Sequence, residues 1–107
     1  YDCSGLAQTF YAFLGVQLPR DADQQYRAGK PVEGIPEPGD LIFFGELGDR
    51  AQRRFAFVTH VAVVLEDWKI IHANGTAWSI SFDDLADTTD PYAAWLRQHN
   101  LGVCRYL

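Results

Sequence analysis

Apolar side chains recur at helical spacing near the start of the chain. Four of them predict the buried face of a helix over residues 3–14, namely Leu6, Phe10, Phe13 and Leu14. Asp2 precedes this helix as a good N-cap, because its carboxylate can accept the free N–H groups of the first turn. Gly15 follows the helix, and we expect this glycine to end it in the left-handed conformation.

A second, shorter helix is predicted over residues 22–28. Asp21 or Asp23 can cap its start, and Gly29 ends it. The next segment, residues 30–39, is rich in proline and glycine, which predicts a rigid, extended loop.

The rest of the chain has the short apolar runs and the alternation that are typical of strands. The predicted strands are residues 41–44, ended by Gly45, residues 57–65, residues 69–73, a segment with alternating Trp78, Ile80 and Phe82, and residues 102–106. Residues 46–55 are interpreted as an exposed loop, and residues 83–97 as a turn followed by a short helix after Pro91. This order predicts an α+β domain in which an antiparallel sheet packs on the N-terminal helix.

The composition fits one folded domain of 107 residues without internal repeats. Hydrophobic residues make up 48% of the chain and aromatic residues 14%, which excludes a disordered segment. The net charge of −5 is spread along the chain and argues against a nucleic-acid partner, which would require clustered Lys and Arg. No apolar run approaches the roughly 20 residues of a membrane-spanning helix. Because the chain opens at a helix cap, without a start methionine or a signal peptide, we expect it to be a segment of a longer protein.

The candidate nucleophile is Cys3, which lies between Asp2 and Ser4 at the start of the first predicted helix. A cysteine attacks as its thiolate, and the free N–H groups and partial positive charge of a helix start favour that form. Such a thiol needs a base from elsewhere in the chain.

His60 and His72 are the candidate partners, because they lie in adjacent strands of one predicted hairpin. Their separation of 12 residues is even, so they share a face of the sheet only if the turn between them has an odd number of residues or a bulge. If they share a face, His60 can take the proton of Cys3 and His72 can hold the His60 ring in the right tautomer. Backbone N–H groups at the helix start would then stabilise an oxyanion. The alternative is a pair of core histidines bonded to backbone groups.

Two other interpretations of these residues stay open. A disulfide between Cys3 and Cys104 would consume the nucleophile, although Cys104 lies in an apolar strand and is typical of a buried thiol. A zinc site made of Cys3, His60 and His72 would lack the closely spaced ligand pairs that are usual for zinc, so we expect no metal and no cofactor.

The remaining polar and aromatic candidates have simpler interpretations. Asp40 is interpreted as a turn residue or the first residue of a strand, and His99 as an exposed side chain. The three tryptophans, Trp68, Trp78 and Trp95, are interpreted as core or hairpin packing, although Trp78 could also line a cleft.

Five short blocks of this sequence resemble those of the NlpC/P60 cysteine peptidases. They occur in the order of that family, at about its spacings, as residues 2–6 (DCSGL), 19–25 (PRDADQQ), 38–44 (PGDLIFF), 59–63 (THVAV) and 71–73 (IHA). The resemblance implies a papain-like α+β fold and hydrolysis of bacterial cell-wall peptides, usually at the bond between γ-D-glutamate and a diamino acid. It implies Cys3 as nucleophile, His60 as base and His72 as the polar third residue. Asp2 and Ser4 match positions that in some members hold the free amine of the substrate, and the block at 19–25 is similar to that of enzymes acting on free wall peptides.

The chain also departs from the family pattern. Members carry a further helix and loop before the cysteine, often with a tyrosine that completes the oxyanion hole, and here only Tyr1 precedes Asp2. We assign Tyr1 no role, and we expect upstream residues to complete the cleft. The loop at 46–55 is longer and more basic than the family leads us to expect. It is interpreted as a solvated turn, with the alternative that Arg50, Arg53 or Arg54 clamps a substrate carboxylate.

Three functions remain in view. The first is a cysteine peptidase on murein peptides, the second an amidase or acyltransferase of the same fold, and the third a non-catalytic wall-binding module. The resemblance implies a bacterial protein of the cell envelope or the exterior, with cytoplasmic recycling of wall fragments as the alternative.

Overall fold

The computed structural model describes residues 2–46, 57–74 and 79–106 of the chain. In these ranges it contains three helices and six strands. The helices are α1 (Cys3–Phe13), α2 (Ala22–Ala28) and α3 (Pro91–Gln98), and the strands are β1 (Lys30–Val32), β2 (Leu41–Glu46), β3 (Phe57–Glu66), β4 (Lys69–Asn74), β5 (Ser79–Asp84) and β6 (Asn100–Arg105). No helix among the described residues is long and apolar enough to cross a membrane.

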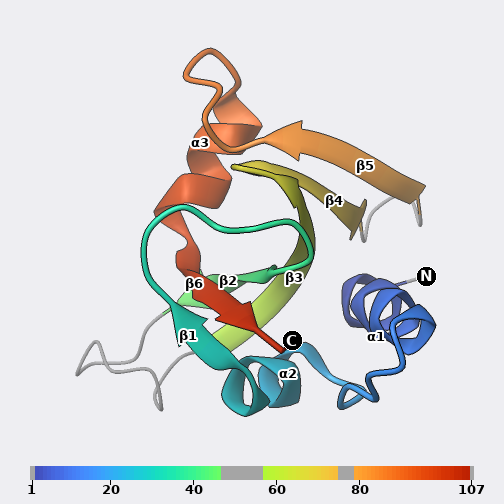
Figure 1. Ribbon diagram of the computed structural model, residues 1–107. Helices are drawn as coiled ribbons and strands as arrows, with labels where there is room; N and C mark the ends of the chain where they lie inside the picture. The colour runs from blue at the N-terminus through green and yellow to red at the C-terminus, as the bar shows by residue number, and fades with distance from the viewer. Residues whose placement is uncertain (1, 47–56, 75–78, 107) are drawn as a thin grey trace.

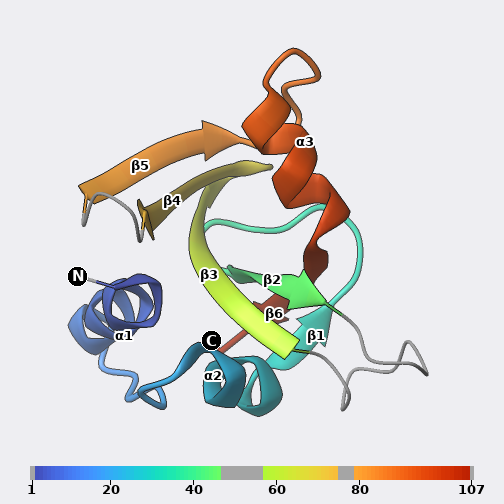
Figure 2. The same cartoon turned by 180° about the vertical axis from the view of Figure 1, so that it is seen from behind.

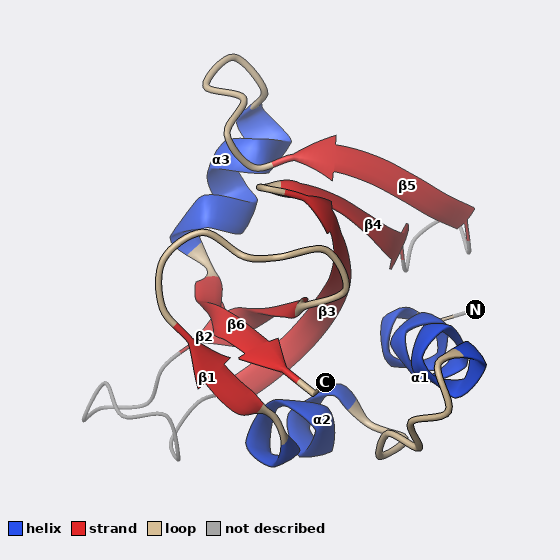
Figure 3. Cartoon of the chain, viewed as in Figure 1, coloured by secondary structure: helices blue, strands red, loops and turns tan. Residues whose placement is uncertain are grey.

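The six strands form one curved antiparallel sheet in the order β1-β6-β2-β3-β4-β5. Figure 1 shows β3 bending through the middle of the molecule, with α1 and α2 on one side of the sheet and α3 on the other. The opposite view in Figure 2 and the colouring of Figure 3 show the same separation of helices and strands. The predicted α+β, papain-like fold with N-terminal helices on an antiparallel sheet is confirmed.

Alternate residues of the central strands β2 and β3 contribute to two separate apolar cores, one on each face of the sheet. Leu41, Phe43, Val61 and Val63 pack with Ala7 and Tyr11 of α1 and with Tyr26 of α2. Ile42, Phe44, Ala62 and Val64 pack with Ile70, Leu85 and Leu96 on the side of α3. Because both faces of β2 and β3 are buried, these strands have continuous apolar runs instead of a simple alternation.

The buried face of α1 differs from the predicted one. Ser4, Ala7 and Tyr11 are buried, whereas Phe13 is 87% exposed and Leu14, just after the helix, is 48% exposed. Tyr11 is held in the core by a hydrogen bond that its hydroxyl donates to the carbonyl of Gly39. The periodicity was right for a helix but only partly right for its buried face, since Phe10 packs against the core whereas Phe13 and Leu14 are exposed.

The predicted helix ends are confirmed. Asp2 caps α1 and accepts the N–H of Gly5 at 2.7 Å, and Gly15 has a φ of 79°, in the left-handed region. Asp21 caps α2 through a capping box with Gln24.

The segment 30–39 is only partly the loop that its prolines predict. Lys30–Val32 forms β1, which pairs with β6 at the edge of the sheet. Pro31 is tolerated there because an edge strand does not need every backbone N–H for pairing. Strand β2 is also longer than predicted, since Gly45 lies within it at a bulge where a side chain would collide with the carbonyl oxygen of Phe57.

Asp40 joins the start of β2 to the end of β6. It is buried, its carboxylate accepts two hydrogen bonds from the Arg105 guanidinium at 2.9 and 2.8 Å, and it also accepts the N–H of Glu37 at 2.9 Å. This pairing raises the pKa of Arg105. The prediction of a turn residue at the start of a strand is confirmed, with an ion pair that the sequence did not reveal.

Strand β5 lies at the other edge of the sheet, and its apolar side chains are not in the core. Ile80 is 45% exposed and Phe82 is 69% exposed. Of the tryptophans, Trp68 packs against the core on the side of α3, whereas Trp95 is 45% exposed and stacks on a half-buried His99. The interpretation of Trp95 as core or hairpin packing and that of His99 as an exposed side chain were therefore wrong, and Trp78 lies outside the described residues.

The hairpin of β3 and β4 contains the bulge on which the position of the two histidines depends. Val64 pairs with Ile70 and Glu66 with Lys69, so Leu65 is one extra residue on β3. Without it, the register set by Glu66 and Lys69 would place His72 on the face opposite to His60. With it, both histidines lie on the same face.

We predict that deleting Leu65 disrupts the domain, whereas Leu65→Ala is tolerated. The deletion shifts one strand by one residue and turns buried side chains of β3 or β4 toward solvent. Leu65 itself is 42% exposed, so its truncation is expected to cost less than about 1 kcal/mol. Thermal unfolding of the two variants checks this, and equal melting temperatures would contradict it.

Candidate active site

Cys3 occupies the first turn of α1, where it is partly exposed at the edge of the core. Burial raises the pKa of the Cys3 thiol, and the charge of Asp2 acts in the same direction. The backbone N–H groups of Val61, Ser4 and Cys3 itself oppose this but do not overcome it. The expected acidic thiol is thus wrong for this structure, because desolvation outweighs the helix start.

Arg20 ties together the two residues that flank Cys3. Its guanidinium lies 2.8 Å from one carboxylate oxygen of Asp2 and 3.3 Å from the other, and it donates to the hydroxyl of Ser4 at 2.9 Å. The Arg20 bond and the N–H of Gly5 lower the pKa of Asp2. The side chain of Asp2 remains 48% exposed, whereas Ser4 is buried.

Gln25 of α2 fixes the segment that carries Arg20. Its side chain is fully buried, and the amide nitrogen donates to the carbonyls of Ser4 at 3.1 Å and Pro19 at 2.8 Å. The loop before Arg20 is thereby held against the first turn of α1. Arg20 and Gln25 both fall in the 19–25 block, which the sequence singled out without assigning a role to either residue.

His60 and His72 are joined by a direct hydrogen bond. The Nε2 atom of His60 lies 2.6 Å from Nδ1 of His72. Burial, together with the charge that His72 can carry, lowers the pKa of His60 to about 4, so His60 is neutral and able to accept a proton at neutral pH. The shared face that the sequence left open is therefore present, and the alternative of two histidines bonded only to backbone is wrong.

Asp83 of β5 is a partner of His72 that sequence reasoning missed. Its Oδ2 atom lies 2.7 Å from Nε2 of His72, a side chain with no exposed surface. Strand β5 places it there because His72 pairs with Ser81, and Asp83 lies two residues further along the same face. The signal was present in the sequence, since Ser81 and Asp83 are the polar positions that alternate with Ile80 and Phe82.

Aromatic rings pack against the two histidines. Tyr92 of α3 stacks on His72, with ring centroids 6.0 Å apart and planes inclined by 14°. Phe44 packs beside His60 with centroids 5.8 Å apart. Both imidazole orientations are therefore fixed by packing as well as by hydrogen bonds.

The thiol and the histidines come from different parts of the fold. Helix α1 packs on β3 and β4, and the Cys3 sulfur faces the backbone N–H of Val61, the residue after His60. In the described part of the chain no hydrogen bond joins the Cys3 thiol to the His60 ring. The structure thus brings His60, His72 and Asp83 together, and separately Asp2, Ser4 and Arg20 around Cys3.

The other interpretations of the two cysteines find no support. Cys3 and Cys104 form no disulfide with each other, and Cys104 is buried in β6 as predicted. Within residues 2–46, 57–74 and 79–106, no group of three or more His, Cys, Asp or Glu side chains could hold a metal ion. Tyr1, Arg50, Arg53 and Arg54 lie outside the described residues, so their roles stay as they were.

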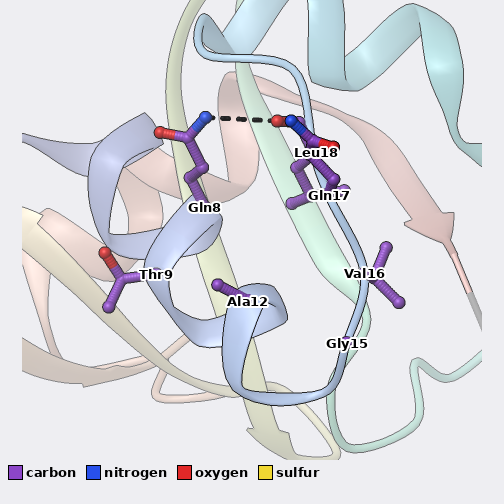
Figure 4. Close-up of a pocket in the computed structure, with 7 residues that line it drawn as sticks. All are labelled: Gln8, Thr9, Ala12, Gly15, Val16, Gln17 and Leu18. Atoms are coloured by element: carbon purple, nitrogen blue, oxygen red, sulfur yellow. Dashed lines mark hydrogen bonds between the residues drawn. The ribbon is translucent and has the colours of Figure 1, made fainter.

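A hollow on the surface lies at the other end of α1. Figure 4 shows it between the C-terminal half of the helix and the connector at Gly15–Leu18, where the Gln8 side chain donates to the carbonyl of Leu18 at 3.2 Å. None of its seven lining residues is acidic, basic or a thiol. It is therefore not part of the candidate active site.

Three comparisons place the chain among known proteins. The sequence model of the NlpC/P60 family matches residues 1–99. The chain is 34% identical over 82 residues to the peptidoglycan endopeptidase RipB of Mycobacterium tuberculosis, covering 76% of this chain and 30% of RipB. It is 34% identical over 93 residues to a gamma-D-glutamyl-L-lysine dipeptidyl-peptidase of Bacillus subtilis, covering 82% of this chain and 28% of that protein.

Solved structures of the NlpC/P60 family have the same fold as this chain. An NlpC/P60 family protein from Bacillus cereus superposes with a TM-score of 0.77 at 32% identity, covering all of this chain and 32% of the other. The chain thus spans less than a third of the length of each of these relatives. From the match over residues 1–99 and the shared fold, the chain belongs to the NlpC/P60 family.

Proposed function

We propose that this domain is a cysteine peptidase that hydrolyses peptides of bacterial peptidoglycan, with Cys3 as nucleophile, His60 as base and His72 as the residue that orients His60. The observation that carries the proposal is the hydrogen bond of 2.6 Å between His60 and His72, next to the strand residue that faces the Cys3 sulfur. A half-buried histidine with a lowered pKa, bonded to a second and fully buried histidine, together with a thiol at a helix start, provides the parts that acyl transfer requires.

The reaction proceeds in two halves. His60 takes the thiol proton on Nδ1, the nitrogen that His72 leaves available, while the sulfur attacks the carbonyl carbon of the substrate. His60 then returns that proton to the leaving amine, and a thioester with Cys3 remains. Water attacks the thioester with His60 again as base, which releases the acid and restores the thiol. N–H groups at the start of α1 would stabilise the oxyanion in both halves.

The pKa shifts of Cys3 and His60 fit a mechanism in which the thiol loses its proton only when substrate is bound. With the pKa of Cys3 raised by burial and that of His60 lowered to about 4, both groups are neutral at neutral pH. Catalytic hydrogen bonds are often long in ligand-free sites and tighten in the Michaelis complex. In this proposal, the hydrogen bond between the Cys3 thiol and His60 therefore forms when substrate binds.

Asp2 and Ser4 would form the subsite for a free amino terminus. Asp2 offers a carboxylate that is half exposed and remains ionised, because Arg20 and the N–H of Gly5 lower its pKa. Ser4 is buried and holds Arg20, so its part is to fix the geometry of Asp2. A subsite of this kind favours short wall peptides with a free N-terminal alanine.

The bond that we assign is the one between γ-D-glutamate and a diamino acid. One of the relatives is named a gamma-D-glutamyl-L-lysine dipeptidyl-peptidase and others peptidoglycan endopeptidases. Peptides with this bond are found in the cell envelope and among recycled wall fragments. In this proposal, a further domain of a longer protein would complete the cleft.

The first experiment is incubation of the intact protein that carries this chain with L-Ala-γ-D-Glu-diaminopimelate. We expect cleavage after glutamate, and a loss of at least about 10³-fold in kcat for Cys3→Ala, as for other covalent nucleophiles. Cys104→Ala, which removes the other thiol from the core, is the matched control and should retain kcat. Binding of the peptide without cleavage by the wild type would favour a wall-binding module, and cleavage only of sugar-linked amides or esters would favour an amidase or acyltransferase.

The raised pKa of Cys3 predicts the pH dependence of its alkylation by iodoacetamide. Only the thiolate reacts, so the rate should rise about tenfold per pH unit through neutral pH and should level off only at a higher pH than for an ordinary cysteine, because the pKa of Cys3 is raised. A preformed thiolate and imidazolium pair would instead give a rate that is constant between about pH 5 and 8. Such a plateau, absent from Cys3→Ala, would contradict the neutral resting site.

The amine subsite predicts a selective defect for Asp2→Asn. Asparagine is also a good N-cap, so α1 should be retained while the charge is lost. We expect KM for the free peptide to rise about tenfold, or about 1.4 kcal/mol, with no change for the N-acetylated peptide. Asp23→Asn, which removes an equally exposed carboxylate paired with Arg27, is the control. An equal effect on both peptides would refute a role of Asp2 in binding the amine.

A further inference from the structure

A continuous chain of hydrogen bonds runs from His60 to a carboxylate. Nε2 of His60 lies 2.6 Å from Nδ1 of His72, and Nε2 of His72 lies 2.7 Å from Oδ2 of Asp83. The three residues come from β3, β4 and β5, so three neighbouring strands each supply one member. His72, in the middle, is completely buried.

The carboxylate decides which nitrogen of each ring carries a proton. An ionised carboxylate only accepts hydrogen bonds, so His72 must donate from Nε2. Neutral His72 then has a lone pair on Nδ1, and His60 must donate to it from its own Nε2. This leaves the lone pair of His60 on Nδ1, the nitrogen that faces away from His72 and can accept a proton from a thiol.

Without the carboxylate, the same two rings could bond in the opposite sense. Nδ1 of His72 would carry the proton and donate to Nε2 of His60, which would place the His60 proton on Nδ1. The hydrogen bond between the rings would keep its length, but His60 would have no lone pair for the nucleophile. A short distance between the two rings is therefore not enough to make His60 a base. A third group has to determine which of the two rings donates the hydrogen bond.

The surroundings of Asp83 fit this task. The Asp83 side chain is only 15% exposed, so water competes little for its oxygen atoms. Burial raises the pKa of the Tyr92 phenol, and the charge of Asp83 acts on that ring in the same direction. Tyr92 in turn stacks on His72 and holds its ring plane. The second carboxylate of β5, Asp84, bonds instead to the backbone N–H of Ala86 at 2.9 Å in the following turn.

We propose that Asp83 is a positioning residue that sets the tautomers of both His72 and His60, so that Nδ1 of His60 is the proton acceptor. When His60 becomes charged during the reaction, the relay also places an anion at its far end, two hydrogen bonds away. This inference rests on the proposed function for its catalytic consequence, but the tautomers can be measured without any substrate.

The first test is nitrogen NMR of the intact protein labelled with ¹⁵N-histidine, at pH 7. We expect both His60 and His72 to carry their proton on Nε2, with an unprotonated Nδ1 in each ring. His60→Gln and His72→Gln variants assign the signals. A proton on Nδ1 of His60 in the wild type would overturn the proposal, whether or not the protein cleaves any peptide.

The second test compares Asp83→Ala with Asp84→Ala, which removes the neighbouring carboxylate from the same strand. For Asp83→Ala we expect mixed tautomers and a fall in kcat of about 10²-fold or more with little change in KM, since disturbing the orienting carboxylate of a triad costs up to about 10⁴-fold. Asp84→Ala should lose a turn hydrogen bond and some thermal stability but keep the wild-type tautomers and kcat.

The two readouts separate the possible failures. Wild-type tautomers and kcat in Asp83→Ala would refute the role of Asp83 while leaving the peptidase intact. A tautomer change in a protein that cleaves no wall peptide would refute the proposed function and retain the relay. Equal losses of kcat in both variants, with unchanged tautomers, would reduce Asp83 to a structural residue.

Discussion

The register of one hairpin determines whether His60 and His72 can contact each other. His60 and His72 are separated by an even number of residues, and the pairing of Glu66 with Lys69 alone would send their side chains to opposite faces of the sheet. The extra residue, Leu65, changes that parity. Every later step depends on it, because the bond between the two rings, the contact of His72 with Asp83 and the stacking of Tyr92 all lie on the face that the bulge selects.

The electrostatics of the site reflect a competition between burial and the helix start. The N–H groups around Cys3 favour a thiolate, but the thiol is largely desolvated and Asp2 adds a like charge, so its pKa rises. Burial moves the pKa of His60 in the opposite direction. Both groups therefore rest in their neutral forms. The hydrogen bonds from His60 through His72 to Asp83 then matter more in our proposal, because the carboxylate of Asp83 can stabilise a charged His60.

Much of the fold could be predicted from the sequence, and the failures have local causes. Helix ends and strand positions followed from Asp2, Gly15 and the apolar runs of β2 and β3, because these signals depend on residues close in sequence. The orientation of α1 and the pairing of β1 depend on distant strands, which periodicity does not encode. The site shows the same division. Cys3, His60 and His72 were identified from residue type and order, whereas the partners of His72 and Asp2, namely Asp83 and Arg20, required the register of β5 and the packing of α2.

The position of β6 has a consequence for how the domain forms. It is the last strand in chain order, yet it lies between β1 and β2 and is fixed to the start of β2 by Arg105 and Asp40. During synthesis, β1 would therefore have no neighbour and β2 would present an open edge until the last residues of this segment leave the ribosome. Because such distant pairings form slowly, the sheet that supports both histidines is completed late in folding.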